Sequence, residues 1–239
     1  MPDRDPLAWL ESLEGVPTAF AGTRDGIDVL LRDRGLRKTR PEQTTDSLLV
    51  GAAASAALDD STSDLAAVRA GTLDAPAAAA VRVSTELLSL VPVVEHSPMQ
   101  AFARLHALAG KGDEPDESLG RPTGAEAADR LATLSQTMLD TSVPALMLAA
   151  IAHAEIVTAA PFASRNGIVA RAAERLIIAA RGVDPKSLVA TELGHSLLRA
   201  EYESNLRGYR DGGRAGLHSW LLYCAEAYTK AAEASPLAG

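Results

Sequence analysis

The chain of 239 residues has little cysteine, few aromatic residues and no long uninterrupted apolar run. Its one cysteine, Cys224, excludes an internal disulfide and a cysteine-based metal site. Cys224 lies in an apolar helical pattern, which predicts a small buried side chain. The longest wholly apolar run, Val143–Ala152, is too short to cross a bilayer. No basic segment followed by an apolar run opens the sequence, so no signal peptide is expected.

The chain also lacks an excess of positive charge. It contains 31 acidic and 23 basic side chains of the Asp, Glu, Lys and Arg types, which gives a formal net charge of -8. Such a surface repels nucleic acid and anionic membranes, and no basic stripe compensates for it, so neither is expected as a partner. Because neither a signal peptide nor a membrane-spanning run is predicted, we expect a cytoplasmic protein. Hydrophobic residues make up 47% of the chain, enough for one substantial core.

What the sequence does contain is helical periodicity and helix-boundary residues. It has no segment of strand period and no internal repeat, so an all-α fold is predicted. Helix starts are expected at Asp5-Pro6, Asp25, Ser63 and Asp74 with Pro76, and a helix end at Gly182. The predicted helices include 25–34, 45–58, 74–90, 98–109, 125–139, 143–159, 168–181, 187–207 and 215–234. Residues Gly110–Gly124 form a long loop rich in Gly, Pro and acid, with room for at most one hairpin.

A short loop between two apolar helical segments carries the residues of chemical interest. The string "AAPFASRNGIVAR" runs from Ala159 to Arg171. Asn166-Gly167 directly precedes the helix predicted from Ile168. Free N–H groups at a helix start bind anions, and Gly allows a ligand to approach the backbone closely. The same two residues are also typical of an ordinary turn between helices, and on these residues alone the turn is the simpler interpretation.

The wider segment resembles the core of the Fic (Fido) family, whose motif is HPFx(D/E)GNGRxxR. The matching residues are Pro161, Phe162, Asn166, Gly167 and Arg171. The flanks are similar too, from "AHA" before the loop to "EYESNLRGYRDGGRAGLHSWLLYCAEAY" after it. The resemblance implies a Fic-like core over 98–239, with a central helix–loop–helix. An N-terminal helical region, 1–97, would pack on it to give one compact unit.

The departures from the motif affect the groups that perform the family's transfer of AMP from ATP. Ala160 stands at the position of the catalytic histidine, the general base. Ser164 stands where an acid would hold Mg²⁺, and a neutral hydroxyl is a poor ligand for that ion. Arg165 replaces a glycine, which would strain a backbone that needs a positive φ. Ile168 replaces an arginine that contacts phosphate.

No other residue is placed by the sequence to replace the missing base. His153 lies seven residues before Ala160, about 10 Å away along a helix. It is interpreted as a hydrogen-bonded interior histidine. The spacing of the other histidines suggests no catalytic or metal-binding constellation, so no catalytic residue and no metal are expected.

A second similarity lies upstream, in the segment 45–60. "ASAALDDSTSDL" resembles the family's inhibitory helix, (S/T)xxxE(G/N), with Ser55 at the first position and Asp59 at the glutamate position. The resemblance implies that Asp59 pairs with Arg171 and blocks the ATP phosphates. Asp59 and Asp60 end a predicted helix, where carboxylates are disfavoured unless a cation is near.

These observations predict a Fic-fold pseudoenzyme that acts through an unidentified protein partner and needs no cofactor. One alternative is a sensor of nucleotide or another phosphate ligand, with Arg165, Asn166, Gly167 and Arg171 as its degenerate binding residues. A second alternative is a transferase of AMP or another phosphate group with changed chemistry. Gly110–Gly124 falls where the family has a target-docking flap, but its acids and proline are unsuited to an edge strand. The sequence leaves open whether the chain forms homo-oligomers.

Overall fold

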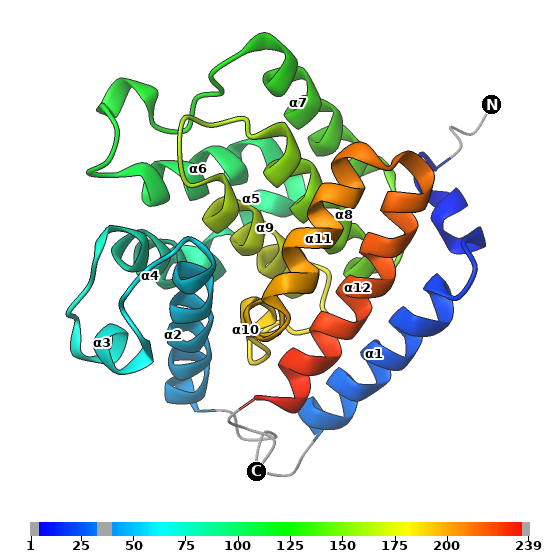
Figure 1. The fold of residues 1–239 in the computed structure, drawn as a ribbon, viewed down its shortest axis with the longest axis horizontal. Coiled ribbons are helices and arrows are strands. Elements are labelled where there is room, and N and C mark those ends of the chain that lie inside the picture. The colour runs from blue at the N-terminus through cyan, green and yellow to red at the C-terminus, as the bar shows by residue number, and fades with distance from the viewer. Residues whose placement is uncertain (1–4, 33–39, 236–239) are drawn as a thin grey trace.

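A computed structural model of the chain describes residues 5–32 and 40–235, and this part is all-α (Figure 1). In chain order the elements are η1 (Ala8–Ser12), α1 (Val16–Arg32), α2 (Pro41–Leu58), α3 (Leu65–Ala70), α4 (Ala75–Glu86), η2 (Leu87–Leu90), α5 (Val91–His96), α6 (Pro98–Gly110), η3 (Asp116–Ser118), α7 (Ala125–Asp140), α8 (Ala145–Ala159), α9 (Asn166–Ala180), α10 (Thr191–Leu197), α11 (Arg199–Asp211) and α12 (Gly213–Glu233). Here η marks a 3-10 helix. Over the described residues the only β-type pairing is the isolated bridge Lys111–Glu114, so the hairpin that the long loop allowed does not form.

Helices α8 and α9 form the centre of the fold. Ten of the 15 residues of α8 and 12 of the 15 residues of α9 are buried, which is typical of helices covered on all sides. The two helices pack directly on each other, and the loop that joins them carries the candidate site. Helices α6 and α7 lie beside one part of this pair, and α11 and α12 beside another (Figure 1).

The N-terminal helices pack on both flanks of this centre. Helix α1 lies along α12, and α2 packs against α4, α9 and α10 (Figure 1). The small residues of α2 allow this close packing: a Cβ on Gly51 would lie 2.1 Å from Nη1 of Arg175 on α9. One hydrophobic cluster draws buried residues from both regions, for example Phe20 and Ala52 with Leu176 and Trp220.

Most predicted helices are present, but several starts differ. Asp25 lies inside α1, which begins at Val16 with Pro17 in its first turn, a favoured proline position. The predicted end of that helix at Arg34 lies outside the described residues. Asp64, and not Ser63, caps α3, because its carboxylate accepts the Ala67 N–H at 2.8 Å.

Two other boundary residues behave as predicted, and one predicted helix is divided. Asp74 caps α4, and Gly182 follows α9 with a φ of 73°. The single helix predicted over 187–207 is wrong. The chain leaves helical geometry at Leu198, with φ -112° and ψ 40°, which separates α10 from α11. Ser187 does not start it, because its φ is 53°.

One helical stretch, Ala75–His96, is long and apolar enough by length and composition to cross a bilayer. It comprises α4, η2 and α5, and 44% of its apolar window is buried within the protein. Its buried side chains belong to the same core as those of α8 and α9. Core helices meet the same criterion of length and composition. A search for uninterrupted apolar runs does not reveal this stretch, because Arg82, Glu86 and Glu95 interrupt it.

Candidate functional site

The loop between α8 and α9 is held in a compact shape by its own asparagine. The Asn166 side chain accepts the Phe162 N–H at 3.0 Å and donates to the Phe162 carbonyl at 2.8 Å. Ala160 ends α8 in the left-handed region, with a φ of 42°, and is exposed. Arg165 also has a positive φ, 56°, which is the conformation for which a glycine would be suited.

The start of α9 has the free donors expected of an anion site. The N–H groups of Asn166 and Gly167 have no acceptor among the described residues. Gly167 faces the groups around Arg171: a Cβ there would lie 2.9 Å from Oδ1 of Asp59 and 3.1 Å from Nη1 of Arg171. The Asp59 carboxylate therefore lies beside the Gly167 backbone, where a phosphate bound at the N-terminus of α9 would lie.

The Arg171 guanidinium is buried and surrounded by acceptors from two other helices. Its Nε donates to the Ser55 hydroxyl at 2.8 Å, and its Nη2 donates to the Ser55 carbonyl at 2.9 Å and to Asp59 Oδ1 at 2.5 Å. Its Nη1 donates to the Tyr202 hydroxyl at 3.2 Å. Burial alone would lower the pKa of Arg171, but Tyr202 and Asp59 outweigh it, so the guanidinium stays charged. The proximity expected for Asp59 and Arg171 is found.

Asp60 does not share this contact. Its carboxylate pairs with Arg199 at 2.7 Å, and both side chains are exposed. Asp60 has a φ of 61°, so the backbone turns sharply after α2 and directs the two adjacent carboxylates to different arginines. Ser55 and Asp59 therefore take the contacts with Arg171 from α2 and its C-terminal end.

The long loop 110–124 contacts the candidate site, and no local sequence pattern predicts this contact. Glu114 accepts a short hydrogen bond from the Ser164 hydroxyl, and Asp113 accepts from Nε and Nη2 of Arg165 at 2.8 and 2.6 Å. Thr123 donates its N–H to the Pro161 carbonyl at 2.8 Å. Glu114 and Asp113 therefore bind the side chains of Ser164 and Arg165, respectively. These are the two positions at which the motif HPFx(D/E)GNGRxxR has an acid and a glycine.

His106, on α6, forms hydrogen bonds with two residues of the same loop. It accepts the Gly120 N–H at Nδ1 (2.9 Å), so the neutral ring carries its proton on Nε2 and donates it to Glu114 Oε1 (3.2 Å). Burial lowers the pKa of His106, which favours this neutral form. The ring stacks on Phe162, with centroids 4.2 Å apart. Glu114 Oε2 is buried and has no hydrogen-bond partner.

A second polar cluster lies deeper in the core. Glu174 accepts from His153 Nδ1 at 2.5 Å and from His195 Nε2 at 3.1 Å. The remaining ring nitrogens accept from hydroxyls, His153 Nε2 from Tyr202 (3.0 Å) and His195 Nδ1 from Tyr223 (2.8 Å). Burial alone would raise the pKa of Glu174, but the imidazole donors hold it well below its usual range. The interpretation of His153 as a hydrogen-bonded interior histidine is confirmed.

This cluster is the grouping of His and Glu side chains that the sequence spacing did not reveal. Ligand atoms of His153, Glu174 and His195 lie within 4.8 Å of one another and could hold a metal ion. Both imidazoles, however, already have a partner on each nitrogen, and burial lowers the pKa of His153 to about 4. The hydrogen bonds account for every ring nitrogen of His153 and His195 without a metal.

Comparison with known proteins shows which fold the chain has. No family model and no curated protein matches the sequence. Among solved structures, a Fic family protein from Desulfovibrio desulfuricans G20 superimposes with a TM-score of 0.75 at 16% identity, over 92% of this chain and 73% of that one. Fic-1 from C. elegans superimposes with a TM-score of 0.67 at 18% identity, over 91% of this chain and 71% of that one.

The structure thus belongs to the class of all-α folds built on a central helix–loop–helix. Within that class, its similarity to both solved structures over about nine tenths of the chain shows that this is the Fic fold. The similarity includes the N-terminal helices as well as the core. The fold predicted from "PFASRNGIVAR" and its flanks is therefore confirmed.

Proposed function

We propose that this chain is a Fic-fold pseudoenzyme that has lost AMP transfer and acts by binding a protein partner. The observation that carries the proposal is the state of Arg171. This residue is 1% exposed, and its four hydrogen bonds go to Ser55, Asp59 and Tyr202. A guanidinium engaged in this way has little capacity left for the phosphates of ATP, because its donors have a fixed geometry and already have acceptors.

The position of Ala160 supports the same proposal. The methyl group sits at the exposed end of α8, where the family's general base would stand, and it cannot accept a proton. The titratable rings of His153 and His106 are engaged in buried hydrogen bonds and do not offer a replacement. Ser164 is a hydroxyl that already donates to Glu114, which does not fit a resident Mg²⁺ ligand.

A test of AMP transfer uses ATP labelled on the α-phosphate with the full chain and a mixture of candidate target proteins. We expect no labelled protein from the natural chain. We also expect none from Ala160→His, because Ser164 and Ile168 would still lack the metal and phosphate contacts. Robust labelling by either form would overturn the proposal in favour of a transferase with changed chemistry.

A sensor of nucleotide or another phosphate ligand is the second candidate, favoured by the free N–H groups of Asn166 and Gly167. It predicts that ATP, ADP or inorganic phosphate raises the melting temperature of the natural chain. At about 100 times its Kd a ligand adds about 2.7 kcal/mol to the unfolding free energy. If no nucleotide has this effect, cross-linking and identification of the bound protein test the interaction role directly.

A further inference from the structure

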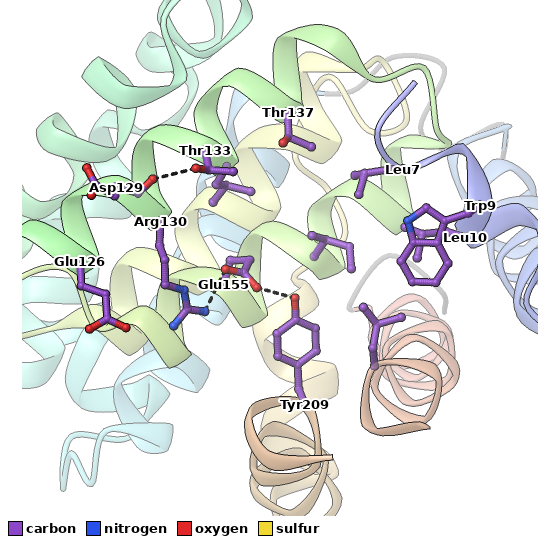
Figure 2. A pocket seen from close by; sticks show the side chains of 13 residues that line it. Leu7, Trp9, Leu10, Glu126, Asp129, Arg130, Thr133, Thr137, Glu155 and Tyr209 are labelled. Atoms are coloured by element: carbon purple, nitrogen blue, oxygen red, sulfur yellow. Dashed lines mark hydrogen bonds and ion pairs between the residues drawn. The ribbon is translucent and has the colours of Figure 1, made fainter. Parts of the chain in front are cut away.

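A cavity of about 630 Å³ lies between η1, α7, α8, α11 and α12, and none of the loop 160–167 lines it (Figure 2). This volume is within the range of small-molecule sites, about 300–1,000 Å³. Its apolar wall is formed by Leu7, Trp9, Leu10, Leu134, Ile151 and Leu217. Trp9 is 41% exposed and lies at one end of the cavity (Figure 2).

The other end of the cavity is acidic. Figure 2 shows Glu126, Asp129 and Arg130 at one end and Leu7, Trp9 and Leu10 at the other. Arg130 is already neutralised, because its Nη2 donates to Glu155 Oε2 at 2.9 Å. Glu126 and Asp129 have no side-chain partner among the described residues. Two uncompensated negative charges therefore lie at one end of the cavity, and the apolar wall lies at the other.

The polar groups between the two ends are fixed. The Tyr209 hydroxyl donates to Glu155 Oε1 at 2.7 Å, and burial together with Glu155 raises the pKa of Tyr209, so the hydroxyl keeps its proton. Arg130 also donates to the Thr158 hydroxyl at 2.9 Å. Among the charged groups that line the cavity, this arrangement leaves Glu126 and Asp129 without a partner of opposite charge among the described residues.

The charge at the opposite end sets the orientation of a bound cation. The Arg214 guanidinium carbon lies 5.2 Å from the Trp9 ring centroid. A positive group is repelled from that end and attracted to Glu126 and Asp129, while an apolar body gains from burial against Leu134 and Ile151.

From this geometry we propose that the cavity is a binding site for a small amine or quaternary ammonium with an apolar body. The cationic group contacts Glu126 and Asp129, and the apolar body fills the space beneath Trp9. The site is separate from the candidate site at the α8–α9 loop, and the proposal does not depend on the pseudoenzyme function.

The test compares three probes with the same chain length, n-octylammonium, n-octanol and octanoate, below their aggregation concentrations. Of the two tryptophans, Trp220 is fully buried, so a saturable change in emission reports on Trp9. We expect octylammonium to bind about fivefold more tightly than octanol, from two exposed charge pairs, and octanoate to bind most weakly. Trp9→Phe removes the fluorescence signal, and calorimetry then verifies that heat of binding remains.

Two sets of variants assign the charge and the place. The double variant Glu126→Gln, Asp129→Asn is expected to reduce octylammonium affinity about fivefold while leaving octanol unchanged. Asp140→Asn, on the same helix but outside the cavity, is the charge control. Thr133→Phe fills the cavity from an exposed position and is expected to weaken every probe at least about tenfold. Thr85→Phe is its control, an exposed threonine with the same type of bond to the preceding turn.

Equal affinity for octylammonium and octanoate would overturn the proposal, because Glu126 and Asp129 would then serve only the start of α7. Unchanged affinity in Thr133→Phe would also overturn it, since the probes would be bound elsewhere. Absence of saturable binding by any probe, with folding verified by circular dichroism, has the same consequence.

Discussion

Removal of the Asp59 carboxylate tests the candidate site most directly. Asp59 pairs with the buried Arg171 at 2.5 Å, and the side chains are 21% and 2% exposed. Loss of a hydrogen bond to a charged group costs about 2 kcal/mol. Asp59 lies at the C-terminal end of α2, so removing its charge regains about 0.5 kcal/mol from the helix dipole. We expect Asp59→Ala to lower the unfolding free energy by about 1.5 kcal/mol, equivalent to a fall of about 3–6 °C in Tm.

The adjacent Asp60 supplies the matched control. It pairs with Arg199 on the exposed surface, where ion pairs contribute little. Asp60→Asn is preferred to alanine because Asn tolerates the φ of 61° at this position. We expect this variant to change the unfolding free energy by less than about 0.5 kcal/mol. Circular dichroism melting of both variants, compared with the natural chain, gives these values.

Titration with ATP then separates a plugged pocket from a purely structural ion pair. If Asp59 excludes phosphate from the α9 N-terminus, Asp59→Ala gains nucleotide affinity that the natural chain and Asp60→Asn lack. If the pair only holds α2 in place, the variant loses stability and gains no binding. If Asp59→Ala is as stable as the natural chain and does not bind ATP, both interpretations of the Asp59–Arg171 pair, the plugged pocket and the structural ion pair, are refuted.

Two further predictions concern the core. Burial lowers the pKa of His153 to about 4 from 6.5, so the unfolded chain binds the proton first. The unfolding free energy should fall by up to about 3 kcal/mol as the pH drops from 6.5 to 4. His153→Gln should reduce this fall, whereas His96→Gln, at an exposed site, should not. Gly216→Ala would place a Cβ 1.8 Å from the Gly208 carbonyl oxygen, which should separate α11 from α12 and lower the free energy of unfolding by about 3 kcal/mol or more. Gly26→Ala is the control: a Cβ there, in α1, has no atom within 4 Å and should raise the free energy of unfolding by about 0.5 kcal/mol. Thermal melting over this pH range and of both glycine variants checks each expectation, and a flat pH profile or an unaffected Gly216→Ala would contradict it.

The elements could be predicted from the sequence where local signals are strong. Asp74 followed by Pro76 predicts the start of α4, and Gly182 the end of α9, because a cap depends on neighbouring residues alone. The division at Leu198 could not be predicted, because α10 is placed by packing: a Cβ on Gly194 would lie 1.9 Å from the Ala227 carbonyl oxygen. Here tertiary contact determines where the helix ends.

The candidate site, like the helices, is predicted by the sequence only where its residues are close together in the chain. Asn166, Gly167 and Arg171 belong to one short segment. The pairing of Asp59 with Arg171, 112 residues away, follows from the sequence only through the family resemblance. Glu114 was not expected to reach Ser164, since nothing local to either residue indicates the contact. The spacing of the histidines does not reveal Glu174 either, although a carboxylate in a run of apolar residues indicates buried partners such as His195.

The second arginine of α9 explains why removing Asp59 is an interpretable experiment. Arg175 is also buried and donates to the Ser47 hydroxyl at 2.7 Å and to Glu192 Oε2 at 3.2 Å. It lies one helical turn after Arg171, so α2 is attached to α9 at two levels. Because the contact through Arg175 does not involve Asp59, α2 should stay in place when that carboxylate is removed. A gain in nucleotide affinity would therefore come from the space vacated by the carboxylate beside Gly167. Detachment of α2 would instead lower the unfolding free energy by about 3–5 kcal/mol, well beyond the roughly 1.5 kcal/mol net loss expected for Asp59→Ala.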